Sequence, residues 1–184
     1  MDKYEVLKQY FGYDAFRDGQ EKMIDAITSG RDVLGIMPTG AGKSLCYQIP
    51  ALMAGENGGI TLVISPLISL MKDQVSALNQ AGVHAAYLNS SLTSGQYYKA
   101  LGYAREGRYP IVYVAPERLL TPEFLDFAVH AKIAMVAVDE AHCVSQWGQD
   151  FRPGYLKIEE FLCTLPKRPV VSAFTATATA EVRD

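Results

Sequence analysis

The residues with the clearest chemical signature lie between Asp32 and Ser44. An apolar run leads into a glycine-rich turn, and Lys43 and Ser44 then begin a segment with a helical pattern. Such a turn presents backbone N–H groups and the positive end of the helix dipole, which together favour phosphate. A lysine there reaches the terminal phosphates of a nucleotide, and the serine hydroxyl can bind Mg²⁺. The residues predicted to bind a nucleoside triphosphate are Thr39, Gly40, Ala41, Gly42, Lys43 and Ser44.

One position departs from the general phosphate-loop pattern G-x-x-x-x-G-K-[ST], because Met37 stands where the first glycine belongs. The alternative interpretation is an ordinary glycine turn before a helix. That alternative leaves the Gly-Lys-Ser sequence at the helix start as a coincidence.

Two adjacent carboxylates, Asp139 and Glu140, follow the apolar run at residues 133–138. Carboxylates that leave a buried strand are costly unless a cation compensates them, and a phosphate loop needs Mg²⁺ beside it. We expect Asp139 to hold the metal and Glu140 to position or deprotonate the attacking water. His142 is expected to relay a contact to a neighbouring surface. The alternative is an acidic helix N-terminus that stabilises the helix dipole.

A possible site for a planar ligand precedes the phosphate loop, where Tyr13, Arg17 and Gln20 lie close together in the sequence. Tyr13 can stack on a base, and an amide such as Gln20 can form a bidentate pair with an adenine edge. Arg17 can support the same group. The alternative is that aromatic residues in front of a helix are core or staple residues.

Two further clusters have polar and aromatic side chains suited to nucleic acid or to coupling. Residues 145–155 combine glycines and a proline with exposed-type aromatic residues and an arginine, which offer stacking surfaces for unpaired bases; a small satellite core is the alternative. The hydroxyls at Thr175 and Thr177 can link a γ-phosphate site to a neighbouring surface, or can simply end a strand and cap a helix. The residues expected to contact nucleic acid or to couple the sites are Gln146, Trp147, Phe151, Arg152, Thr175 and Thr177.

The elements that must position these residues alternate between strands and helices. Apolar, β-branched runs predict strands near 33–36, 60–64, 85–88, 110–114, 133–138 and 169–174. Helical spacing predicts helices at 2–11, 23–30, 43–54, 67–82, 97–104 and 122–130. This alternation with short connections predicts an α/β domain of three layers around a mostly parallel sheet. In such sheets ligands bind beyond the carboxyl ends of the strands, where each cluster above is placed.

Length and composition limit the other possibilities. The chain has 184 residues, of which 49% are hydrophobic, so we expect one domain with a sizeable core. Its net charge of −3 provides no global basic field, and nucleic-acid binding would have to depend on local contacts. Three widely spaced cysteines argue against a disulfide framework or a zinc site and fit a reducing cytosol. Neither a transmembrane span nor a signal peptide is visible.

The order of these segments resembles the first RecA-like lobe of the RecQ family of superfamily 2 helicases, over nearly the whole chain. Residues 11–20 are similar to the adenine-reading motif of that family, and residues 37–50 to its phosphate loop, including the missing first glycine. Residues 65–74 and 115–119 resemble its DNA-contacting motifs. Residues 139–143, 145–155 and 175–177 resemble its Mg²⁺ and hydrolysis motif, its aromatic-rich coupling loop and its third motif.

The resemblance implies a RecA-like phosphate-loop lobe at residues 1–184, with residues 1–30 as an adenine-motif segment. It implies ATP and Mg²⁺ as cofactors and an ATP-dependent 3′→5′ DNA helicase of repair and recombination, located in the cytoplasm of a bacterium. The expected partners are single-stranded DNA or a junction with a 3′ overhang, and a second lobe in cis that supplies an arginine finger. That lobe and the zinc-binding and winged-helix regions of the family are absent from this chain.

Two alternatives remain open. One is another enzyme class, such as a DEAD-box-like RNA helicase; His142 in place of a second Asp, and Trp147, favour the DNA interpretation by resemblance only. In isolation, the chain could also be a nucleotide-binding or DNA-binding module without significant turnover.

Overall fold

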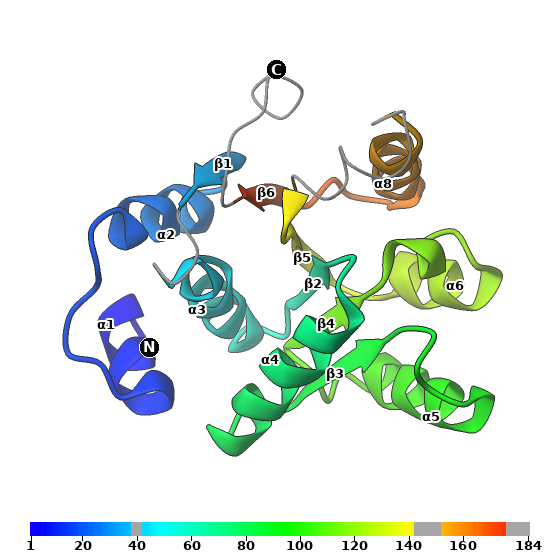
Figure 1. Cartoon of the computed structure of the whole chain (residues 1–184), viewed down its shortest axis with the longest axis horizontal. Helices are drawn as coiled ribbons and strands as arrows, with labels where there is room; N and C mark the ends of the chain where they lie inside the picture. The colour runs from blue at the N-terminus through cyan, green and yellow to red at the C-terminus, as the bar shows by residue number, and fades with distance from the viewer. Residues whose placement is uncertain (38–41, 142–151, 176–184) are drawn as a thin grey trace.

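A single sheet of six parallel strands forms the centre of the molecule (Figure 1). The computed structural model describes residues 1–37, 42–141 and 152–175, the last range with side chains from residue 157 onward. The strands are β1 (Val33–Ile36), β2 (Ile60–Ile64), β3 (Ala85–Leu88), β4 (Ile111–Val114), β5 (Ile133–Val138) and β6 (Val170–Thr175). All neighbouring pairs run parallel, in the order β1-β6-β5-β2-β4-β3. The last strand in the chain, β6, therefore lies between β1 and β5.

Helices cover both faces of this sheet, which gives the expected three layers (Figure 1). One face packs against α1 (Lys3–Val6), the π-helical η1 (Leu7–Phe11), α2 (Gln20–Thr28), α3 (Lys43–Gly55) and α4 (Ile68–Gln80). The other packs against α5 (Ser94–Arg105), the short 3₁₀ helix η2 (Pro116–Arg118), α6 (Pro122–His130) and α8 (Arg152–Thr164). The predicted α/β class with a parallel sheet is thus confirmed.

The central strand β2 shows why the sequence folds in this way. Each of its five residues is buried, and successive side chains of a strand point to opposite faces. Val63 belongs to the core beneath α3 and α4, whereas Leu62 and Ile64 belong to the core beneath α5 and α6. An uninterrupted apolar run is therefore required at this strand, as in parallel sheets generally.

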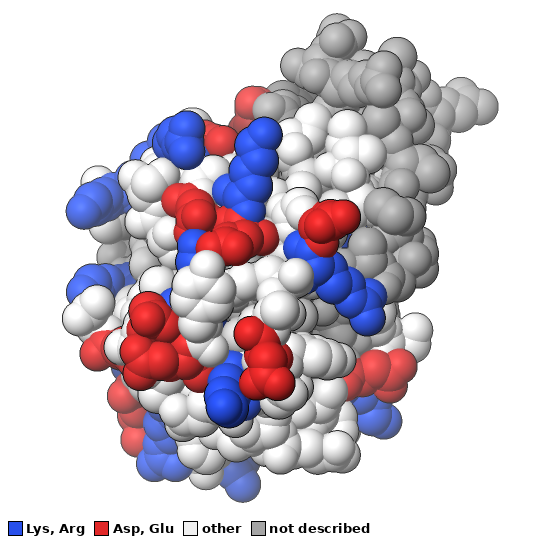
Figure 2. Space-filling view, turned by 90° about the vertical axis from the view of Figure 1, so that its left-hand side faces the viewer, with Lys and Arg blue, Asp and Glu red and all other residues white. Residues whose placement is uncertain are grey.

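Charges of both signs are mixed on the face of the molecule drawn in Figure 2. On the face drawn in Figure 2, acidic and basic side chains lie next to one another and no broad area of one sign forms. Lys3 pairs with Glu21 and Asp25 and so joins α1 to α2. Among the residues that the structure describes, no helix is long and apolar enough to cross a membrane.

Candidate active site

A cavity of about 610 Å³ opens beside the N-terminus of α3, between the N-terminal segment of the chain and α4. Where Lys43 and Glu140 line it, the cavity lies at the carboxyl end of β5, and parallel α/β sheets bind ligands at such ends. From there it continues along α4 to Ala81. The residues predicted from the sequence that line it are Tyr13, Arg17, Gln20, Gly42, Lys43, Ser44 and Glu140. Segments far apart in the chain therefore meet in one cavity.

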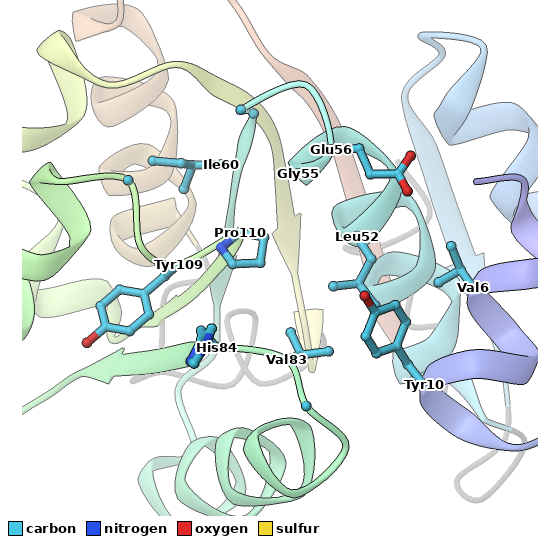
Figure 3. A pocket seen from close by; sticks show the side chains of 14 residues that line it. Val6, Tyr10, Leu52, Gly55, Glu56, Ile60, Val83, His84, Tyr109 and Pro110 are labelled. Atoms are coloured by element: carbon cyan, nitrogen blue, oxygen red, sulfur yellow. The ribbon is translucent and has the colours of Figure 1, made fainter.

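A second cavity, of about 270 Å³, lies at the amino ends of the strands (Figure 3). Tyr10 and Leu52 lie on one side of it, and Pro110 and His84 lie on the other. None of the residues predicted to do chemistry lines this cavity. The larger cavity is therefore the candidate active site.

Lys43, Asp139 and Glu140 form a compact charged cluster. Lys43 is the first residue of α3, and Asp139 directly follows β5. The Lys43 ammonium forms an ion pair with the Glu140 carboxylate and lies 3.6 Å from Asp139 Oδ1. The exposed fractions of the three side chains are 12% for Lys43, 0% for Asp139 and 15% for Glu140, so water screens the cluster little.

Within the described part of the chain, the Lys43 ammonium lies beside two carboxylates, those of Asp139 and Glu140. Burial raises the pKa of the Asp139 carboxyl above its ordinary value, and the neighbouring Lys43 ammonium opposes that rise. Glu140 has a positive φ of 53°, a left-handed conformation that few residues other than glycine adopt. The chain therefore turns sharply as it leaves β5, and strain of this kind is frequent at functional sites.

Tyr47 contacts Asp139, and Gln74 contacts Tyr47; sequence analysis included both residues only within longer segments, at 37–50 and 65–74, and gave neither a role of its own. The Tyr47 hydroxyl oxygen lies 2.8 Å from Asp139 Oδ2 and 2.8 Å from Gln74 Oε1. Burial raises the pKa of the Tyr47 phenol well above its ordinary value, and the nearby Tyr113 and Asp139 act in the same direction. The only sequence signal was the spacing of Tyr47, four residues after Lys43 and hence on the same helix face. A buried tyrosine in an apolar helix looks the same when it only packs.

Gln20 ties the N-terminal segment to the phosphate loop. It is buried, its Oε1 accepts a hydrogen bond from Arg17 N at 2.8 Å, and its Nε2 donates to the Gly42 carbonyl at 3.0 Å. Tyr13 lies at the same cavity with 52% of its surface exposed, as a side chain available for stacking would be. Binding of adenine by Tyr13, Arg17 and Gln20 stays a prediction.

Met37 explains the departure from the general phosphate-loop pattern. Its side chain is buried in the core, and Cys46 Sγ of α3 lies 3.7 Å from Met37 Sδ. The methionine fills space between β1 and α3. Glycine at this position would leave a cavity there.

Several predicted residues lie outside the described parts of the chain. They are Thr39, Gly40, Ala41, His142, Gln146, Trp147, Phe151 and Thr177. Arg152 begins α8, and its side chain is not among those described. Thr175 ends β6, is buried, and pairs in register with Ile36 of β1, close to where the phosphate loop begins.

Known proteins are similar to this chain in both sequence and fold. A profile of the DEAD/DEAH box helicases matches residues 17–184. The chain is 52% identical to the ATP-dependent DNA helicase RecQ of Bacillus subtilis over 97% of its length. It is 42% identical to the ATP-dependent helicase SGS1 of Saccharomyces cerevisiae over 96%. The chain spans 30% of the bacterial relative and 13% of the yeast one.

Solved structures agree with this match. A hypothetical ATP-dependent RNA helicase from Sulfolobus tokodaii superposes with a TM-score of 0.74 and 25% identity, over 98% of this chain and 52% of that one. The DUF1998 helicase MrfA, solved with DNA and AMPPNP, has a TM-score of 0.78 at 18% identity, over 98% and 26%; at that identity it supports the fold alone. The resemblance to RecQ drawn from the motifs is confirmed, and the chain belongs to the DEAD/DEAH box helicase family, in its RecQ branch.

Proposed function

We propose that residues 1–184 are the ATP-binding first lobe of a helicase motor, with residues 1–30 as its adenine-binding segment. In this proposal ATP hydrolysis drives 3′→5′ unwinding of DNA in repair and recombination, together with a second lobe. The observation that carries it is the convergence of Lys43, Asp139 and Glu140 in one cavity with Gln20. Several similar proteins are named ATP-dependent DNA helicases, which supports ATP and DNA as the ligands.

Lys43 would bind the β- and γ-phosphates of ATP. Its ammonium is already held at the cavity by Glu140, at the helix N-terminus where phosphate is favoured. Incoming phosphates would compete with Glu140 for this ammonium. The Glu140 carboxylate would then be able to accept a proton from the attacking water, which is the role of a general base.

The residues present fit Mg²⁺. Asp139 is fully buried and lies beside Glu140, so a cation bound there would stabilise carboxylate charge that is shielded from water. A carboxylate and a hydroxyl are the hard oxygen ligands that Mg²⁺ prefers. Among the described residues, no group of three or more His, Cys, Asp or Glu side chains could hold a metal. Asp139 and Ser44 would therefore hold Mg²⁺ together with nucleotide phosphates and water, as is usual for this ion; when bound, it would neutralise charge that develops on the phosphates.

DNA binding would depend on local contacts. The net charge of −3 provides no global basic field, and the face drawn in Figure 2 shows no broad basic area, so the segments at 65–74, 115–119 and 145–155 are the proposed contacts. Leu67 and Ile68 are 41% and 37% exposed at the start of α4, where a strand of DNA could reach them. Roles for Arg152, Trp147 and Phe151 in stacking, and for His142, Thr175 and Thr177 in coupling, belong to the same proposal.

Nucleotide titration tests the proposal. The 184-residue chain should bind a fluorescent ATP analogue in the presence of MgCl₂, and Lys43→Ala should weaken binding at least tenfold. Lys22→Ala, which removes an exposed lysine from α2, is the matched control and should bind as the unchanged chain does. Equal binding by all three proteins would overturn the assignment of the phosphate site.

A second measurement separates DNA from RNA as the natural strand. Single-stranded DNA and RNA of the same sequence and length should be titrated against the nucleotide-bound chain at low and moderate salt. We expect tighter binding of DNA. A clear preference for RNA would favour the RNA-helicase alternative, for which the archaeal RNA helicase structure provides a precedent of fold.

A further inference from the structure

Tyr47 holds a fixed position between the phosphate loop and the sheet. It is fully buried on α3, one helical turn after Lys43. Its ring packs against Phe174 of β6 with centroids 5.5 Å apart, and against Tyr113 of β4 with centroids 6.5 Å apart in an edge-on arrangement. A ring held from both sides has little freedom, so the direction of its hydroxyl is set by the core.

That hydroxyl completes the contacts of Asp139. Oδ1 of Asp139 accepts a hydrogen bond from the Glu140 backbone N at 2.9 Å and faces Lys43 Nζ. Oδ2 lies 2.8 Å from the Tyr47 hydroxyl. Both oxygens of the carboxylate are therefore held by protein groups, which fixes the plane in which it can present itself to a cation.

The single hydrogen of the Tyr47 hydroxyl determines which of its neighbours accepts a hydrogen bond from it and which donates one to it. A phenol has a single hydrogen, and both Asp139 Oδ2 and Gln74 Oε1 lie within 2.8 Å of the Tyr47 oxygen. An ionised carboxylate is the stronger acceptor, so the hydrogen goes to Asp139. The phenol oxygen can then accept a hydrogen bond from the NH₂ end of the Gln74 amide after half a turn of that amide, or from the hydroxyl of Tyr113, which also interacts with Tyr47. With the amide in this orientation, the contacts run from Gln74 through Tyr47 to Asp139.

Gln74 belongs to a different part of the site. It lies on α4 and lines the same cavity as Lys43 and Ser44. The segment that ends at Gln74 is also the one proposed above to contact DNA. The series of hydrogen bonds therefore links a wall of the cavity to the proposed metal ligand.

We propose that Gln74 and Tyr47 act in series as positioning residues for the Asp139 carboxylate, so that the placement of α4 sets the affinity of the site for Mg²⁺. This inference rests on the proposed function, because it assumes that Asp139 binds Mg²⁺ beside a nucleotide. Neither residue needs to touch the metal or the reacting atoms. Each acts through the next residue in the series.

The test is to measure how strongly Mg²⁺ tightens nucleotide binding. A fluorescent ADP analogue is titrated against the 184-residue chain in MgCl₂ and in EDTA, and the ratio of the two Kd values is compared. Tyr47→Phe keeps the ring and removes only the hydroxyl. We expect it to bind the analogue normally in EDTA and to lose about 10-fold or more of the Mg²⁺ effect, the usual loss when a partner of a metal ligand is removed.

Tyr97→Phe is the matched control, since Tyr97 is a buried tyrosine on the other face of the sheet. It should keep the full Mg²⁺ effect, while Gln74→Leu should lose part of it. An unchanged ratio in both Tyr47→Phe and Gln74→Leu overturns the inference and leaves the proposed function standing. If Tyr47→Phe does not fold, the ratio for Gln74→Leu decides alone. If the unchanged chain shows no Mg²⁺-dependent binding, the proposed function fails, and this inference fails with it.

Discussion

Gln20 Nε2 donates a hydrogen bond to the Gly42 carbonyl oxygen at 3.0 Å, which joins the first residue of α2 to the residue before α3. Gly42 has a φ of +76°, and a Cβ atom added to it would lie 2.4 Å from Gln20 Nε2. The backbone at Gly42 is therefore both left-handed and crowded. This contact holds the start of α3, where the phosphate loop is proposed, against the proposed adenine-binding segment.

Replacement of this glycine should damage the site in two ways. Gly42→Ala should destabilise the folded chain by about 1–2 kcal/mol, because a residue with a Cβ is unfavourable in a left-handed conformation, and the added methyl group should also displace the Gln20 amide. For a domain of this size each kcal/mol lowers Tm by about 2–4 °C. We expect weaker nucleotide binding as well as a lower melting temperature.

Gly12→Ala provides the control for the backbone cost alone, because Gly12 has a φ of +75° with nothing within 4 Å of an added Cβ. It should lower Tm less than Gly42→Ala and leave nucleotide affinity unchanged. Gly42→Ala combined with Gln20→Ala should recover the part of the loss that comes from crowding. Equal losses for Gly12→Ala and Gly42→Ala would show that the contact with Gln20 is unimportant.

Gln20→Ala should also change the preference among bases. If the amide reads adenine, its removal should weaken ATP binding more than GTP binding, by a part of the about 1–3 kcal/mol that a bidentate base contact is worth. Titration of both nucleotides against the variant and the unchanged chain measures this difference. A loss that is equal for the two bases would mean that Gln20 acts only by holding Gly42.

Asp139→Asn should stabilise the chain at neutral pH while impairing its site. Because the folded state raises the pKa of Asp139, mainly by burial, folding becomes less favourable as the pH rises through that pKa. An asparagine avoids the cost of an ionised, buried group. We expect a higher Tm for the variant at pH 7–8, by about 2–4 °C for each kcal/mol recovered.

The difference in Tm between Asp139→Asn and the unchanged chain should shrink as the pH falls toward about 4, which is the ordinary pKa of an aspartate in an unfolded chain. Melting curves from pH 4 to 8 measure it. Asp126→Asn removes an exposed carboxylate and should give no such gain. If the gain for Asp139→Asn is the same at all pH values, burial of the charge is not its cause.

The Lys43 and Glu140 pair should show strong coupling in a double-mutant cycle. Lys43→Ala deprives two largely buried carboxylates of their ammonium, and breaking a buried pair costs about 3–5 kcal/mol. Adding Glu140→Gln should recover part of that loss, with a coupling energy of about 0.5–3 kcal/mol from denaturant unfolding. The exposed pair of Arg105 and Asp126 is the reference and should show about 0–1 kcal/mol. Comparable coupling in the two cycles would contradict the buried character of the Lys43 pair.

The parts of the site that follow from local sequence were predicted well. Glycine turns, the helix start at Lys43 and the strand end at Asp139 all depend on neighbouring residues, and the structure has α3 begin at Lys43 and β5 end at Val138. The sequence also predicted the six strands to within a residue or two at their ends. The helix predicted at 2–11 divides into the short α1 and the π-helical η1, because apolar spacing does not distinguish hydrogen bonds to the fourth and fifth residues back.

Tertiary relationships were not predictable in the same way. The involvement of Tyr47 and Gln74 depends on how α3 and α4 pack, and neither residue type nor spacing distinguishes a buried tyrosine that packs from one that orients a carboxylate. The left-handed turn at Glu140 is equally invisible, since glutamate rarely adopts it. Met37 looked like a missing glycine until its packing against Cys46 gave it a structural reason.

The position of β6 between β1 and β5 has a consequence for synthesis and folding. β1 precedes the proposed phosphate loop and β5 precedes Asp139, yet among the described strands β1 pairs with β6 alone, in a register that joins Val33 to Ser172. In a nascent chain, the strand that pairs with β1 in the described sheet is therefore missing until residues 170–175 have left the ribosome. Contacts of such long sequence separation form slowly and leave apolar strand edges exposed meanwhile. During translation, β1 should therefore stay unpaired until β6 has been synthesised. Chaperones that shield unpaired strands should raise the yield of folded protein.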